Sequence, residues 1–209
     1  MIQEEHAMAN YTVETNQTEE IAAEAPVNES YLTYEQVNII IAFQKLWLDI
    51  ASWMRSFIKA DIYETKNLQS TKDYLLTLPS EFYNTFAIFY GPVTAQRIAN
   101  FMQRFIEAGM KVVESLKYGD AILSDSRIVE WYKIADEFSA FLGQINIYWD
   151  EAQWKYLLYQ YIKLKIDEIN AIVNDNFEEE ITLYNAIEDM VFLMASYMAR
   201  GIISSNLQS

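Results

Sequence analysis

The 209-residue chain contains no cysteine, and its single histidine, His6, lies in an acidic N-terminal stretch. Cysteine and histidine supply most soft metal ligands, thiolate nucleophiles and proton carriers that work near neutral pH. The five glycines are widely scattered, so no loop resembles those that cradle phosphate groups. These absences exclude the usual nucleotide-binding motifs and argue against most classes of enzyme. We therefore predict a protein that is not an enzyme and that needs no cofactor.

Positive charge is also scarce. Lys and Arg number 15 against 30 Asp and Glu, which gives a formal net charge of −15, and residues 1–33 hold seven glutamates without any Lys or Arg. Nucleic acids and anionic lipids are bound by clustered Lys and Arg, so we predict no nucleic-acid partner. The most apolar stretch, 37–54, is interrupted by Asn38, Gln44, Lys45 and Asp49, which are costly in hydrocarbon. We predict no membrane insertion.

Two regions differ in composition. Residues 1–33 are rich in Glu, Asn, Thr and Ala, contain Pro26 and show no sustained apolar period, so burial would not offset the cost of ordering them. We predict a disordered acidic tail there and a single helical-bundle domain over 34–209. The tail lacks the basic start and apolar core of a secretory signal, and a cysteine-free chain suits a reducing compartment. We expect a cytoplasmic protein.

The domain is patterned for long helices. Apolar residues recur at three- and four-residue steps over about 34–60, as one face of a helix requires. Pro79 and the Gly91-Pro92 pair break up the stretch 61–92, so we predict a helical crossover there. Gly143 is predicted to end a later helix. Further long helices are predicted over about Ile98 to Leu116, Ser124 to Leu142, Asp150 onward and Glu178 to Ser204. The predicted fold is all-α: an up-and-down four-helix bundle with one additional helix and a helical crossover.

The helix that begins at Asp150 differs from the others because its apolar side chains point in almost every direction. They include Trp154, Tyr156, Leu157, Leu158, Tyr159, Tyr161, Ile162, Leu164 and Ile166. Such a helix is either central in its own fold or in contact with another subunit. We favour the central position and keep a subunit interface as the alternative, with Tyr156 and Tyr159 as candidate interface residues. A homo-oligomer, in particular a dimer, is the predicted partner.

Acidic side chains are the remaining candidates for chemistry. Asp49, Glu107, Asp167 and Glu188 come from four different predicted helices, and hard cations accept oxygen ligands alone. The Glu-x-x-His pairs of di-metal bundles are absent. Glu107 and Asp167 each have a lysine four residues away, which is the spacing of an ordinary exposed ion pair. We assign neither a metal ligand nor a catalytic residue.

Several segments of the domain form a recognisable set. They are Leu46-Trp47 through Trp53-Met54-Arg55, Phe89-Tyr90-Gly91, Lys117-Tyr118-Gly119-Asp120, residues 131–142 with 145–149, and Tyr184 to Ile203. Together they resemble a family of small uncharacterised helical proteins from spore-forming Firmicutes, which implies a helical bundle. Some members carry an acetylglutamate-kinase name, but the α/β pattern and glycine loops of that enzyme have no counterpart here.

The family pattern carries a histidine on each of several helices, and the matching positions in this chain are Ile50, Phe105 and Tyr161. The resemblance therefore implies a divergent member in which apolar and aromatic groups replace those histidines. Two hypotheses of function stay open. The first is a non-catalytic helical bundle that acts through protein association, in particular self-association. The second is a small-ligand or carboxylate-metal binding protein whose site lies between the helices near Ile50, Phe105, Tyr161 and Glu188.

Overall fold

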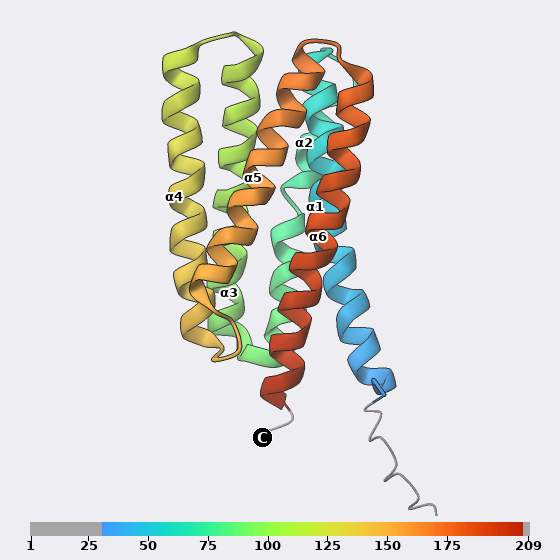
Figure 1. Ribbon diagram of the computed structural model, residues 1–209, viewed down its shortest axis with the longest axis vertical. Coiled ribbons are helices and arrows are strands. Elements are labelled where there is room, and N and C mark those ends of the chain that lie inside the picture. The colour runs from blue at the N-terminus through green and yellow to red at the C-terminus, as the bar shows by residue number, and fades with distance from the viewer. Residues whose placement is uncertain (1–30, 207–209) are drawn as a thin grey trace, which may run out of the picture. The chain divides into compact units, whose positions relative to one another are not determined.

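The computed structural model describes residues 31–206, and the helices α1 to α6 belong to one compact unit. The described range contains six helices and no strand, which confirms the all-α fold. The helices are α1 (Tyr34–Ile62), α2 (Leu68–Leu75), α3 (Leu78–Lys117), α4 (Ala121–Ile145), α5 (Glu151–Val173) and α6 (Phe177–Asn206) (Figure 1). None of these helices is long and apolar enough to cross a membrane. The predicted tail lies outside the described residues, apart from 31–33.

The long helices alternate in direction (Figure 1). From Gly91 onward α3 packs against α4, α4 against α5 and α5 against α6, and these four form the up-and-down bundle. α1 is the additional helix, and it packs against α6 and against the first part of α3. α2 and the part of α3 before Gly91 form the crossover. The predicted architecture is therefore present.

The reversal inside α3 depends on glycine. Gly91 has φ 72° and ψ 172°, a conformation that side-chain-bearing residues rarely adopt, and Pro92 follows it. Tyr90 directly precedes this turn. Its hydroxyl accepts a hydrogen bond from Asn146 Nδ2 at 2.7 Å, and its ring lies 5.8 Å from that of Trp149. The turn is thus fixed to the connection between α4 and α5.

That connection corrects one prediction. Gly143 does not end α4, which continues to Ile145 before the chain becomes extended at Asn146. The glycine instead permits close packing, because a Cβ atom there would lie 3.3 Å from the Cβ of Glu151 and 3.4 Å from the carbonyl oxygen of Trp149. A glycine in a helical pattern can mark a close approach as well as an end.

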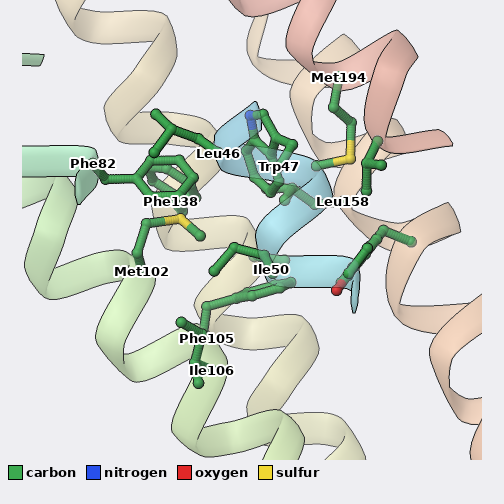
Figure 2. Close-up of a cluster of buried hydrophobic side chains, with 14 of the residues drawn as sticks. Leu46, Trp47, Ile50, Phe82, Met102, Phe105, Ile106, Phe138, Leu158 and Met194 are labelled. Carbon is green, nitrogen blue, oxygen red and sulfur yellow. The ribbon is translucent and has the colours of Figure 1, made fainter. Parts of the chain in front are cut away.

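The core runs through all the long helices. Figure 2 shows Trp47 of α1, Phe82 and Met102 of α3, Phe138 of α4 and Leu158 of α5 in one cluster of buried side chains. Burying a side chain of this size stabilises the fold by about 1.5–3 kcal/mol. Helix α5 packs against α1, α3, α4 and α6, which agrees with the central position favoured from its all-round apolar sequence.

Candidate functional site

Charged side chains are buried where α1, α5 and α6 meet. Lys165 and Glu168 of α5 are both 0% exposed, and they lie on one face of the helix because they are three residues apart. Lys165 Nζ donates hydrogen bonds to Glu168 Oε2 at 2.9 Å and to the carbonyl oxygen of Ala51 at 3.1 Å. Buried charges of this kind persist only when they are paired and hydrogen-bonded.

Side chains of α1 and α6 extend this ionic cluster. Arg55 Nε lies 3.8 Å from Glu168 Oε1 and donates a hydrogen bond to Glu180 Oε1. Lys59 Nζ donates to the other oxygen of Glu180 at 3.0 Å. Lys165, Glu168, Arg55, Lys59 and Glu180 therefore link three helices through alternating charges, and we call them the ionic cluster.

Two tyrosines surround the inner end of the ionic cluster. Lys165 Nζ lies 5.9 Å from the ring centre of Tyr161 and 5.7 Å from that of Tyr184, while the Arg55 guanidinium lies 4.0 Å from the Tyr184 ring centre. The hydroxyls of Tyr184 and Ser52 share a hydrogen bond of 2.9 Å. Rings over cations add a further attraction, so the aromatic groups help to hold both bases in place.

Burial and neighbouring charges shift the pKa values of groups in and beside the ionic cluster. Loss of solvent lowers the pKa of Lys165, although the neighbouring Glu168 carboxylate opposes that shift. Loss of solvent also raises the pKa of Tyr161 well above its ordinary value, and the charge of Glu168 adds to the rise. Burial acts to raise the pKa of Glu180, but hydrogen bonds from Arg55 and Lys59 outweigh it and lower that pKa. Lys165 and Glu168 are fully buried and join the helices away from solvent, whereas the side chains of Arg55 and Lys59 at the outer end are 26% and 38% exposed.

The predicted pocket residues occupy the core. Ile50, Phe105 and Tyr161 are at most 1% exposed and belong to one apolar cluster. Ile50 and Phe105 lie close together in Figure 2, and the rings of Phe105 and Tyr161 lie 5.9 Å apart. They line none of the three pockets described on the body. Glu188 is only partly buried and lies outside this apolar cluster, near the phenol of Tyr184. The structure thus brings three of the four residues together, in packed surroundings.

Three of the four candidate metal ligands have other partners. Asp49 pairs with Lys45, and Lys163 Nζ donates to Asp167 Oδ2 at 2.6 Å, as the spacing of exposed helix pairs predicts. Glu107 instead accepts a hydrogen bond from Gln103 Nε2 at 3.0 Å. Within residues 31–206 no group of three or more His, Cys, Asp or Glu could hold a metal ion. Nothing in this range supports the carboxylate-metal form of the second hypothesis.

A groove of about 520 Å³ opens between α1, α2 and α3. Its lining residues are Phe57, Asp61, Leu68, Gln69, Lys72, Leu76, Glu107, Met110, Lys111, Glu114 and Tyr118. Two of the acids have basic partners, since Lys117 lies 3.9 Å from Asp61 and Arg127 lies 2.9 Å from Glu114. Lys72 and Lys111 form no ion pair with the described part of the chain. The groove therefore combines an apolar lining with two available cations.

The two predicted interface residues have different surroundings. The Tyr159 ring lies 4.6 Å from the Tyr132 ring, and its hydroxyl donates a hydrogen bond to Asp136 Oδ1 at 2.8 Å, so Tyr159 joins α5 to α4 within one subunit. Tyr156 is 56% exposed. Tyr156 is therefore the more exposed of the two, and Tyr159 is partly exposed.

Other exposed apolar side chains lie at the level of Tyr156. α6 runs between α1 and α5 (Figure 1), with Ser52 bonded to Tyr184 on one side and Trp154 packed on Tyr197 at 5.1 Å on the other. Counting residues from those two contacts places Ile41 of α1 and Tyr156 of α5 close to the level of Ala195. Phe192 and Leu193 lie within one turn of that level and are 38% and 52% exposed, while Ile41 is 55% exposed. We call the surface made by Ile41, Tyr156, Phe192 and Leu193 the outer face.

Comparisons with known proteins do not assign the chain to a family. No protein-family model, curated protein or solved structure matches the chain. The resemblance to the Firmicutes family therefore stays a prediction, and function must be inferred from the chain's own residues.

Proposed function

We propose that the protein is a non-catalytic helical bundle that acts through self-association, and that the outer face is its contact surface. The proposal is supported by the exposure of four large apolar side chains on α1, α5 and α6, which are 38% to 56% exposed and lie close to one level when residues are counted from the Ser52–Tyr184 and Trp154–Tyr197 contacts. Single exposed apolar residues are ordinary, whereas a contiguous patch is typical of an interaction site. Tyr156, already a candidate from sequence, belongs to this patch.

A second copy of the chain is the occupant that suits the charges around the outer face. Asp189 and Arg200 of α6 are exposed on either side of Leu193, and neither forms an ion pair within residues 31–206. A surface that carries both signs around an apolar centre can meet itself, because a two-fold contact uses the same patch on both subunits. This complementarity offsets the repulsion expected between two acidic chains.

The proposal predicts a dimer whose formation depends on the outer face. Multi-angle light scattering of the full chain between 1 and about 100 μM would report the dimer, and Leu193→Glu would shift the population to monomer because it places two carboxylates in an apolar contact. Val129→Glu is the matched control, since Val129 is 67% exposed on α4 away from the outer face. A wild-type chain that stays monomeric throughout this range would overturn the proposal.

Small-ligand binding is a second candidate, which the groove between α1, α2 and α3 favours. We propose an amphipathic molecule as its ligand, with an apolar part against Phe57 and Met110 and an anionic group near Lys72 and Lys111. The groove volume of about 520 Å³ falls within the range of ordinary ligand sites. Calorimetric titration with dodecanoate would detect binding that Lys111→Glu weakens. Absence of heat, together with no co-purified mass in native mass spectrometry, would contradict this candidate.

A further inference from the structure

Helix α6 carries two seams of regularly spaced residues. The buried seam contains Ile187, Val191, Met194, Met198 and Ile202. A second seam follows alternating steps of three and four residues along the solvent side: Ala186, Asp189, Leu193, Ser196, Arg200 and Ile203. All six of these residues are exposed or partly exposed. Steps of three and four residues place these six side chains along one face of α6.

The solvent-side seam is complementary to itself when it is reversed. Turned end for end about the midpoint between Met194 and Ala195, it places Asp189 opposite Arg200, Leu193 opposite Ser196 and Ala186 opposite Ile203. Each layer then joins an acid to a base or a large side chain to a small one. We infer that α6 pairs antiparallel with α6 of a second copy, about a two-fold axis at this midpoint, an inference that rests on the proposed self-association.

The opposite orientation is disfavoured by the same residues. A parallel pair would place Asp189 against Asp189 and Arg200 against Arg200, and like charges in contact are repulsive. It would also place Leu193 against Leu193 and Ser196 against Ser196. One layer would then hold two large side chains and the next two small ones, which packs less evenly than one large and one small side chain in each layer. The antiparallel pair avoids both penalties.

The flanking helices agree with the position of the axis. Ile41 of α1 and Tyr156 of α5 both lie close to the level of Ala195, which adjoins the midpoint. A two-fold axis that runs across the outer face at this level brings each residue to its own equivalent in the second copy. Ile41 would then meet Ile41 on one side of the α6 pair, and Tyr156 would meet Tyr156 on the other.

Charge reversal tests this pairing. Because position 189 of each copy lies opposite position 200 of the other, Asp189→Arg brings two arginines together at both ends of the contact. Arg200→Asp likewise brings two aspartates together at both ends. Each single variant should raise the dimer dissociation constant by about tenfold, since a modest attraction becomes a repulsion at two places. Two arrangements should restore association: the double variant D189R/R200D, and an equimolar mixture of the two single variants, which forms a heterodimer. Sedimentation velocity measures all four samples.

Matched controls keep the outcomes separate. Asp125→Arg and Lys133→Asp make the same charge changes at exposed positions of α4 and should leave the dissociation constant unchanged. A wild-type monomer would overturn the proposed self-association and the pairing with it. A wild-type dimer that neither single reversal weakens would overturn the pairing alone and leave self-association standing. Circular dichroism of each variant confirms that the helices are retained.

Discussion

The three helices α1, α5 and α6 distribute polar and apolar groups in opposite ways on their two sides. Where they meet, they bury Lys165 and Glu168, whereas on their outer face they expose Ile41 and Leu193. Folding alone favours charged side chains at the surface and large apolar side chains in the interior. The buried charges are compensated by partners within the chain, as every member of the ionic cluster contacts an opposite charge. For the outer face we propose a partner outside the chain, a second copy of it.

The largest effect on stability is expected from removing one charge of the buried Lys165–Glu168 pair. Glu168→Gln would leave Lys165 buried without a carboxylate, and removal of one member of a buried pair costs about 3–5 kcal/mol. Urea denaturation should show a loss of this size in the free energy of unfolding. The neighbouring pair gives the control, because Lys163 and Asp167 are substantially exposed and Asp167→Asn should cost less than about 1 kcal/mol. Equal losses for both variants would show that the ionic cluster is not buried.

Sequence could predict the helices but not this contrast. The periodicity of apolar residues indicates the long helices and the crossover, because helix packing needs one continuous apolar face whatever its neighbours are. Lys165 and Glu168 have the same kind of spacing as the exposed Lys163 and Asp167. Only the packing of α1 and α6 against α5 decides which pair is buried, and a single sequence does not contain that information.

The sequence predicted only part of the candidate interface, because it does not show which helices pack against each other. Tyr156 and Tyr159 are equivalent in sequence, but α4 provides Tyr132 and Asp136 as partners for Tyr159 alone. Ile41 and Leu193 belong to helices distant in the chain, and their common level follows from contacts such as that between Ser52 and Tyr184. The packed surroundings of Ile50, Phe105 and Tyr161 likewise depend on how three helices converge.

A moderate effect is expected on the exposed side. Ile41→Ser should raise the dimer dissociation constant by about tenfold, because it removes most of an apolar side chain from each copy, while the unfolding free energy of the monomer changes little. Sedimentation equilibrium measures the first quantity, and urea denaturation at low protein concentration measures the second. A large loss of monomer stability without a change in association would place Ile41 in the core and contradict the comparison.

The smallest effect is expected in acid. The pKa of Glu180 is lowered from 4.5 in the folded chain, although burial opposes the shift, because Arg55 and Lys59 donate hydrogen bonds to its carboxylate. Its stabilisation is therefore complete above about pH 4.5 and is lost as the pH falls through the folded pKa. Thermal unfolding of the wild-type chain and of Glu180→Gln should differ at pH 7 and converge toward pH 3. Parallel curves would show that the charge of Glu180 does not stabilise the fold.

The mass of the 209-residue chain in solution tests the central claim most directly. The chain has a mass of 24.5 kDa. Sedimentation equilibrium at micromolar concentration should give about twice that mass, and Leu193→Glu should return it to that of one chain. A single-chain mass for the wild-type protein at every concentration would contradict the assignment of the outer face to a second copy.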